Sequence, residues 1–321
     1  MSDSTQEVSE WLSNFGTALD RADFDAAVKM FEDESYWRDL VSITWNIMTL
    51  EGKEEIKAML EAAVPEAKPG QWRIEGNATS ENGVISSWFS FETVVSRGKG
   101  QIRLKDGKCW TLLTTMTELK GFEEKKGASR TKGVQHGAVP NRQTWLERKT
   151  HEAVEFGITK QPYCLIIGGG QGGIGLGARL KQLDVPTIIV EKNIRPGDSW
   201  RNRYKSLCLH DPVWYDHLPY LPFPDHWPIF SPKDKLGDWL EMYTKVMELE
   251  YWHSTECKNA RYDKQTQEWT VTLDRGGKTV VLRPKQFVLA TGMSGVPHVP
   301  KIPGANKFKG TQHHSSKYTS G

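Results

Sequence analysis

The stretch from Tyr163 to Gly173 constrains the fold of this chain more than any other part of it. A short apolar run ends in three glycines with the spacing Gly168-x-Gly170-x-x-Gly173, and a helical pattern of apolar residues begins at once. This spacing predicts a strand, a tight turn and a helix. The first glycine lets the chain turn, the second lets backbone approach a ligand, and the third lets the helix pack on the strand. The free N–H groups and the dipole at the helix start favour a bound anion.

A second apolar run, residues 187–190, ends in Glu191, which lies 23 positions beyond Gly168. An acidic residue at the end of the second strand accepts hydrogen bonds from a ribose with free hydroxyls. The two features together predict a dinucleotide site, with the diphosphate over the glycine turn. The alternative is a purely structural turn, with Glu191 on the solvated end of a strand.

Length and charge indicate two modules. A chain of 321 residues with 37% hydrophobic and 26% charged residues can form two globular domains with substantial cores. The net charge of +2 predicts no nucleic-acid partner. Residues 1–120 carry 13 basic and 20 acidic side chains, whereas the remainder carries 29 and 20. This asymmetry favours two separate modules.

The cysteines and the N-terminus bear on the compartment. Cys109, Cys164, Cys208 and Cys257 are far apart and form no CxxC motif, which predicts free, buried thiols in a reducing compartment. The N-terminus is polar and acidic, so we expect no signal peptide, and no apolar run approaches the length of a membrane span. A cytoplasmic protein is therefore expected.

The first module has an α+β pattern. Apolar spacing predicts helices over residues 6–20 and 52–64, and Asp23 is placed to cap another helix between them. Alternating runs separated by Gly-containing turns then predict the strands Gln71–Asn77, Val84–Val95, Gln101–Leu104 and Cys109–Leu119. Helices followed by an antiparallel sheet define an α+β layout.

This module, over residues 6–120, resembles the NTF2-like (SnoaL-like) fold. The resemblance rests on the order of elements and on Trp37-Arg-Asp-Leu40 followed by Thr44-Trp-Asn46. It implies a sheet wrapped around a cone-shaped pocket, with Asp39 as the candidate catalytic acid, and a possible homodimer formed through this domain. The alternative is that Asp39 is solvated or salt-bridged on a domain used for packing or pairing.

The rest of the chain divides into a linker and a second domain. Residues 121–160 are basic and then polar, which predicts a linker with a short helix at Thr144–Glu155. Residues 161–321 then form the nucleotide-binding domain, and residues 1–120 precede the linker. In that domain Pro232 begins an amphipathic helix, and the predicted strands are Glu268–Leu273, Thr279–Leu282 and a buried strand from Gln286 that ends in a small-residue turn at Gly292.

Several motifs of this second domain occur in the same order in one enzyme family. They are the glycine turn with Glu191, Gly197-Asp-Ser-Trp-Arg-Asn-Arg-Tyr204, Leu218-Pro-Tyr-Leu-Pro-Phe-Pro224, Ala290-Thr-Gly292, and Phe308-x-Gly310-xxx-His314-xxx-Tyr318. With these motifs, residues 160–321 resemble the flavin-containing monooxygenases. Tyr318 stands where Baeyer–Villiger relatives are expected to have Trp.

The resemblance implies an α/β Rossmann-like domain that binds FAD, with NADPH as the reductant. It implies oxygenation of a small organic substrate at N or S through a flavin C4a-hydroperoxide. Positions implied to contact the cofactor are Gly168, Gly170, Gln171, Gly172, Gly173, Glu191, Lys192, Ser199, Trp200, Arg201, His210 and Asp211. The motif formed by Phe308, Gly310, His314 and Tyr318 would couple the FAD and NADPH domains.

Two departures from the family pattern leave alternatives open. His210-Asp211 stands where the family often has an Asn near the flavin, so Asp211 is the candidate catalytic residue. No second Gly-x-Gly-x-x-Gly occurs, so we expect the chain to be truncated before an NADPH-binding domain. The alternatives are a degenerate flavoprotein that binds FAD without turnover, a Baeyer–Villiger-type oxygenase, and an enzyme acting only through the N-terminal cone.

Overall fold

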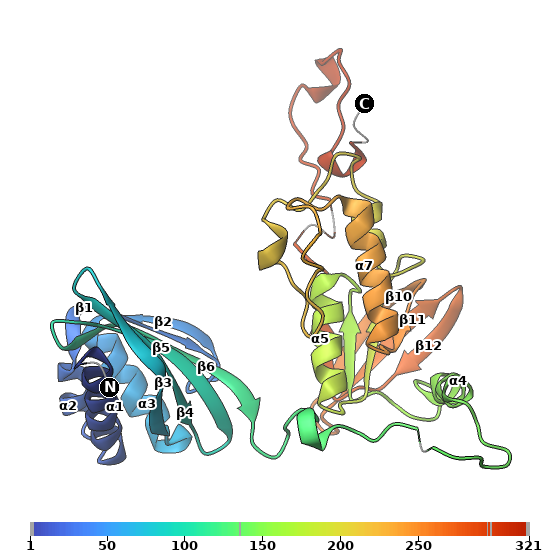
Figure 1. Ribbon diagram of the computed structural model, residues 1–321. Coiled ribbons are helices and arrows are strands. Elements are labelled where there is room, and N and C mark those ends of the chain that lie inside the picture. Colours follow the sequence, from blue (N-terminus) through green and yellow to red (C-terminus); the bar gives the residue numbers. More distant parts are fainter. Residues whose placement is uncertain (1–2, 135, 294, 296, 319–321) are drawn as a thin grey trace. The chain divides into compact units, whose positions relative to one another are not determined.

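The computed structural model describes residues 3–134, 136–293, 295 and 297–318, and it divides into two compact units between Glu123 and Glu124. Unit 1, up to Glu123, has three helices on one face of a curved six-stranded sheet (Figure 1). Its helices are α1 (Asp3–Asp20), α2 (Phe24–Lys29) and α3 (Gly52–Ala67). Its strands are β1 (Phe31–Leu40), β2 (Ile47–Glu51), β3 (Gly70–Glu81), β4 (Val84–Glu92), β5 (Ser96–Lys105) and β6 (Lys108–Leu119). The order is β2-β1-β6-β5-β4-β3, with β1 and β6 parallel and the other pairs antiparallel.

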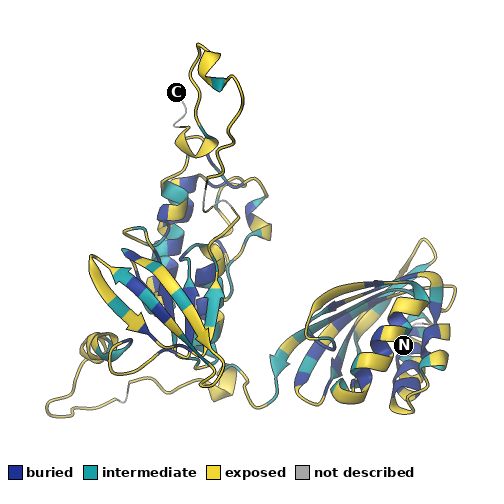
Figure 2. Ribbon diagram, turned by 180° about the vertical axis from the view of Figure 1, so that it is seen from behind, coloured by how far each residue is buried: buried dark blue, intermediate teal, exposed yellow. Residues whose placement is uncertain are grey.

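An aromatic core joins the helices of unit 1 to the sheet. Phe15 of α1 contacts the rings of Trp11, Phe31, Trp37 and Trp72, at centroid distances of 4.8 to 5.9 Å. Figure 2 shows that the buried residues lie on the faces of helices and strands that are turned toward each other. Each such side chain contributes about 1.5–3 kcal/mol when fully buried, so this layer stabilises unit 1 without any ligand.

The structure confirms most predicted elements of unit 1 and corrects two. Asp23 caps α2 by accepting a hydrogen bond from the backbone N–H of Ala26 at 2.9 Å. The run predicted as a strand to Val95 ends at Glu92, because the Thr93 hydroxyl accepts from the N–H groups of Val95 and Ser96 and holds a turn there. Strands β1 and β2 were not predicted, since polar Ser35 and Asp39 occupy buried positions of β1 and interrupt its apolar alternation.

Unit 2, from Glu124, consists of a parallel sheet between a layer of helices and a small antiparallel sheet. The parallel sheet has the order β13-β7-β8-β9, formed by β7 (Cys164–Ile167), β8 (Thr187–Val190), β9 (Tyr251–Trp252) and β13 (Gln286–Leu289). The antiparallel sheet contains β10 (Thr255–Asp263), β11 (Glu268–Arg275) and β12 (Lys278–Leu282). The helices are α4 (Trp145–Glu155), α5 (Gln171–Gln182), α6 (Asp198–Arg201) and α7 (Lys233–Val246), and the 3-10 turns are Gly127–Ser129, Val213–Tyr215, Ala305–Lys307 and Ser315–Lys317.

The two faces of the parallel sheet have separate cores. On one face Leu165 and Val190 pack with Val271 and Leu273 of the antiparallel sheet. On the other face α5 and α7 share a buried cluster that includes Ile174, and Ile166 and Ile189 lie beneath α5. This arrangement is a Rossmann-like α/β fold, as expected for the second domain. The predicted short helix is also confirmed, because Thr144 caps α4 through the N–H of Glu147 at 3.1 Å.

The four cysteines are free thiols. Cys109 and Cys164 are buried, and burial raises the pKa of the Cys164 thiol to about 11, so it stays protonated near neutral pH. Cys208 and Cys257 are half-buried, which corrects the expectation that all four are buried. No helix within the described ranges is long and apolar enough to span a membrane.

Candidate functional site

Three neighbouring parallel strands end at the same edge of the sheet, and a loop follows each of them. Ile167, the last residue of β7, pairs with Val190 of β8 and with Leu289 of β13. Beyond these residues the backbone contacts continue, since Gly168 N–H donates to the Val190 carbonyl at 2.8 Å and Ala290 N–H donates to the Ile167 carbonyl at 2.7 Å. The carboxyl ends of parallel strands are where open α/β sheets bind ligands.

Steric contacts explain the first and third glycines of the turn. Gly168 has a φ of +111°, and a side chain there would place its Cβ 2.3 Å from the carbonyl oxygen of Ala290. A Cβ on Gly173 would lie 1.9 Å from the carbonyl oxygen of Gly168. Both positions therefore exclude a side chain, and the helix α5 packs directly against the turn.

The start of α5 is open, which fits an anionic ligand. Gly170 is the N-cap residue, and no side chain caps the helix. A Cβ on Gly172 would meet no atom within 4 Å, and one on Gly170 would meet just the Ser199 hydroxyl, at 3.8 Å. The first-turn N–H groups of a helix attract anions, and here no side chain caps them. The turn therefore fits the diphosphate that its spacing predicts.

Glu191 points toward the glycine turn. Its Oε2 accepts a hydrogen bond from the Gly169 N–H at 2.8 Å, and its Oε1 accepts from the Asn193 N–H at 2.9 Å. The residue is 7% exposed, so it is not on a solvated strand end, although a purely structural turn stays the alternative. A carboxylate has about four acceptor sites, and two are occupied by these N–H groups. The remaining acceptor capacity fits a diol such as the ribose of a dinucleotide.

Tyr251 completes the support of the turn and was not predicted from the sequence. Its hydroxyl donates to the Gly169 carbonyl at 2.9 Å, so the two peptide groups that flank Gly169 are held by Glu191 and Tyr251. Burial, reinforced by the charges of Glu191 and Asp198, raises the pKa of Tyr251 far above its usual range. The phenol is therefore a permanent donor. A two-residue strand has no periodicity that could have revealed it.

Residues of α6 lie beside the start of α5. The indole N–H of Trp200 donates to the side-chain oxygen of Gln171 at 3.1 Å, and Ser199 is the neighbour of Gly170 described above. Gln171, Ser199 and Trp200 are thus gathered at one place with the glycine turn. Their contacts with a cofactor stay a prediction.

Arg201 forms ion pairs with the neighbouring helix α7. Its guanidinium lies 3.2 Å from Asp198, 2.8 Å from Asp238 and 3.0 Å from Glu241, and its side chain is 8% exposed. Asp238 and Glu241 belong to α7, so this side chain ties α6 to α7. The structure gives Arg201 a structural role, and its predicted contact with a cofactor stays a prediction.

The other predicted cofactor residues are not joined to the turn. Lys192, His210 and Asp211 are exposed, and within the described part of the chain their side chains make no hydrogen bond or ion pair. Burial raises the pKa of Asp216, and the nearby charge of Asp211 raises it further. The catalytic role of Asp211 therefore stays a prediction.

The C-terminal motif forms local contacts. Phe308 is exposed, and its ring lies where a Cβ on Gly310 would come within 2.5 Å. His314 caps a 3-10 turn by accepting from the Ser316 N–H at 3.1 Å, and the ring of Tyr318 stacks on His313 at 5.6 Å. A role in coupling two domains stays a prediction for these residues.

Asp39, the candidate acid of unit 1, is enclosed by donors. It is fully buried, and it accepts hydrogen bonds from the Ser42 hydroxyl, the Ile43 N–H, both the N–H and hydroxyl of Thr44, and the Thr114 hydroxyl. Five donors exceed the four acceptor sites of a carboxylate. Asp39 therefore holds the loop after β1 in place, and within the described part of the chain it is neither solvated nor salt-bridged, which corrects the alternative considered for it. Across the described residues no group of His, Cys, Asp and Glu side chains could hold a metal ion.

Comparisons with known proteins point to one family. Residues 196–321 match the family model described as flavin-binding monooxygenase-like. The chain is 35% identical over 161 residues to indole-3-pyruvate monooxygenase YUCCA1 from Oryza sativa subsp. japonica, a match that covers 50% of this chain and 39% of the relative. The chain spans about two fifths of the length of the curated relatives that it matches.

Solved structures give the same kind of match. The flavin-containing monooxygenase from Stenotrophomonas maltophilia has a TM-score of 0.45 and 23% identity, and the match covers 50% of this chain and 47% of that chain. The OTEMO complex with FAD and NADP has a TM-score of 0.41 and 23% identity, covering 50% and 32%. This part of the chain is therefore similar to flavin-binding monooxygenase-like proteins.

Proposed function

We propose that unit 2 is the FAD-binding part of a flavin-dependent monooxygenase that uses NADPH and O2 to oxygenate a small organic substrate. The observation that carries the proposal is the Glu191 carboxylate, which is fixed against Gly169 at the open start of α5 and has acceptor sites to spare. The match of residues 196–321 to a flavin-binding family supports the choice of flavin among dinucleotides.

The charge of Glu191 supports FAD rather than NADPH at this turn. The N–H groups at the start of α5 would bind the diphosphate, and Glu191 would accept hydrogen bonds from the ribose hydroxyls. A ribose that carries a 2′-phosphate would bring a second negative charge next to this buried carboxylate, which is strongly unfavourable. We therefore assign NADPH to another site of the whole protein.

The flavin supplies the redox chemistry when it is bound: substrate, O2, NADPH and a proton give the oxygenated substrate, water and NADP+. The protein must hold the cofactor and exclude water from the reacting centre. The residues suited to this task are Trp200, which is fixed by Gln171, and the turn that follows Ala290 beside Gly168. We propose that Asp211 lies near the flavin and steadies the oxygenating species, and that His314 is part of a domain-coupling motif.

The finer proposals concern the substrate and unit 1. We propose a soft N or S centre as the site of oxygenation. The second candidate is a 2-oxo acid, which the name of the relative, indole-3-pyruvate monooxygenase, favours. For unit 1 we propose an NTF2-like fold, supported by its helices on one face of a six-stranded sheet. We also propose that this domain pairs two copies of the chain and that the protein is cytoplasmic.

The test combines cofactor binding with product analysis. The purified chain, supplied with FAD, is expected to show the visible absorbance of bound flavin. In a longer form of the protein that also contains the NADPH site, NADPH and 18O2 with a thioether, a tertiary amine or a 2-oxo acid should then give a product with one labelled oxygen. Bound flavin without NADPH-dependent product would instead establish a flavoprotein without turnover. The absence of bound flavin would refute both.

A further inference from the structure

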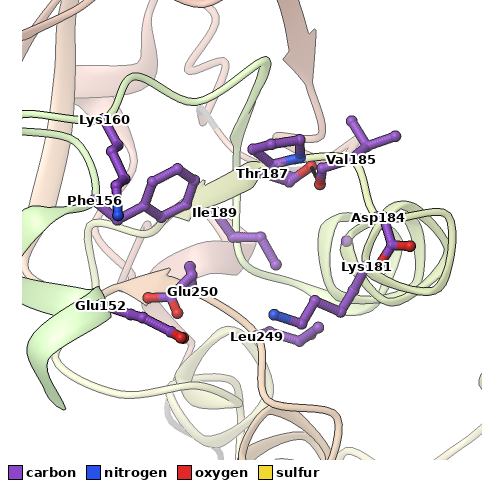
Figure 3. Close-up of a pocket in the computed structure, with 12 residues that line it drawn as sticks. Glu152, Phe156, Lys160, Lys181, Asp184, Val185, Thr187, Ile189, Leu249 and Glu250 are labelled. Atoms are coloured by element: carbon purple, nitrogen blue, oxygen red, sulfur yellow. Dashed lines mark hydrogen bonds between the residues drawn. The ribbon is translucent and has the colours of Figure 1, made fainter. Parts of the chain in front are cut away.

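A cavity lies at the opposite end of the parallel sheet from the glycine turn. Its volume is about 280 Å3, and it is enclosed by α4, the end of α5, the start of β8 and the segment before β9 (Figure 3). Thr187, the first residue of β8, lines it, whereas Glu191 follows the last residue of the same strand. The cavity is therefore separate from the proposed dinucleotide site.

Two opposite charges in this cavity attract each other, but no direct contact joins them. Among the described residues, neither the Glu250 carboxylate nor the Lys181 ammonium makes a hydrogen bond or an ion pair. Figure 3 shows the carboxylates of Glu250 and Glu152 close together, with Lys181 reaching toward them from the other side. Glu152 is 3.7 Å from Lys149, which is itself held by Glu248 at 3.0 Å.

Burial makes the charged form of the Glu250 carboxylate unfavourable in the absence of a ligand. It raises the pKa of Glu250, and the charge of Glu152 adds to this effect, while Lys181 and Lys149 oppose it. Lys160, the other cation of the cavity, is paired with Glu155 at 2.6 Å and is not free to neutralise Glu250. A ligand cation next to Glu250 would relieve this cost.

The remaining surface of the cavity is apolar. Phe156, Ile189 and Leu249 line it together with the charged groups, and Ile189 is buried beneath α5. The volume lies just below the range of about 300–1,000 Å3 that is usual for small-molecule sites, so one compact molecule would fill it. A dinucleotide or a peptide is too large.

We propose that this cavity binds a free amino acid with an apolar side chain. The ammonium of the ligand would pair with Glu250, its carboxylate with Lys181, and its side chain would pack on Phe156 and Leu249. Each charge-assisted contact is stronger than a neutral hydrogen bond, and Glu250 and Lys181 are opposite in sign to the adjacent ammonium and carboxylate of the ligand. The proposal does not rest on the proposed flavin chemistry.

The test is calorimetric titration of the flavin-free chain with L-phenylalanine, phenethylamine and 3-phenylpropionate, followed by the other apolar amino acids. We expect an amino acid to bind about tenfold more tightly than the analogue lacking either charge. The Glu250→Gln and Lys181→Met variants should each lose about tenfold in affinity. Glu250→Gln should fold, because an uncharged amide of the same size removes the burial of charge.

The matched control is Glu256→Gln on the exposed part of β10, which should leave the affinity unchanged. Binding should also weaken as the pH falls and Glu250 takes up a proton. The proposal is overturned if no apolar amino acid binds at millimolar concentration. It is equally overturned if the amine or the acid alone binds as tightly, or if both variants bind like the wild type.

Discussion

Asp39 in unit 1 and Glu191 in unit 2 are both buried carboxylates at the ends of strands, yet their surroundings differ. Five donors surround Asp39, and they come from its own loop and from Thr114 of the neighbouring strand. Two backbone N–H groups donate to Glu191, one from the glycine turn and one from its own loop. A carboxylate whose acceptor sites are filled maintains the fold, whereas one with sites left over can still receive a ligand.

This difference separates two uses of a buried charge. Removing Asp39 leaves several buried donors without a partner, so the cost appears in stability. Removing the charge of Glu191 affects fewer internal contacts, so most of the cost should appear in ligand affinity. The predictions below follow from this contrast.

The largest effect is expected for Asp39→Ala. The loss of an acceptor for five donors should destabilise unit 1 by about 3–5 kcal/mol, because buried donors without partners are costly. Calorimetry should show the transition of unit 1 lowered by roughly 10–20 °C, with FAD affinity unchanged. Asp33→Ala is the control, since Asp33 is a surface residue paired with Lys53, and its loss should leave the unfolding temperature of unit 1 nearly unchanged. If Asp39→Ala unfolded at the same temperature as the wild type, the contrast between Asp39 and Glu191 would not hold.

Glu191→Gln should weaken FAD binding by about 100-fold, because an amide cannot accept from the two N–H groups and a diol together. Flavin fluorescence titration measures this change. The unfolding temperature should fall far less than in Asp39→Ala. Equal affinity for FAD in the variant and in Glu256→Gln would show that Glu191 is a structural residue like Asp39.

Gly173→Ala tests the shape of the turn that presents Gly169 to Glu191. The new methyl group would overlap the Gly168 carbonyl, so we expect a loss of about 2 kcal/mol in the stability of unit 2. Gly172→Ala, where a Cβ meets open space, should stay within about 0.5 kcal/mol of the wild type without ligand. Urea unfolding of both variants decides the point, and similar curves would argue against the close packing of α5 on the turn.

The smallest effect is expected for Tyr251→Phe. The variant keeps the ring and loses the hydrogen bond to Gly169, which costs about 1 kcal/mol, or roughly fivefold in FAD affinity. The test is an FAD titration alongside a thermal melt. A fall in melting temperature with unchanged affinity would mean that Tyr251 supports the sheet and not the cofactor turn.

The sequence revealed the parts of the site whose chemistry is local. The glycine spacing and the position of Glu191 follow from short-range constraints on a strand, a turn and a helix, and the structure brings them together as expected. Tyr251 escaped detection because its contact with Gly169 spans 82 positions. The ion pairs between Arg201 and α7 are likewise long-range contacts, since Glu241 lies 40 positions from Arg201.

The same reasoning explains the errors in unit 1. The strand β1 carries buried Ser35 and Asp39, so its pattern of apolar residues is broken although its buried face is continuous. A polar residue in the core can be recognised as structural only when its hydrogen-bond donors are known. One donor to Asp39, the hydroxyl of Thr114, lies 75 positions away in the sequence, so the pattern around Asp39 does not reveal it. The sequence therefore allowed Asp39 to be proposed as an acid, but it could not show that hydrogen-bond donors fill the acceptor sites of its carboxylate.

The most direct test of the account is a pair of calorimetric titrations of the wild-type chain, one with FAD and one with FMN. If Glu191 and the start of α5 hold the adenosine ribose and the diphosphate, FAD should bind at one per chain. FMN, which lacks the adenosine part, should then bind at least about 100-fold more weakly. Equal affinities for the two flavins, or no binding of FAD, would contradict the account.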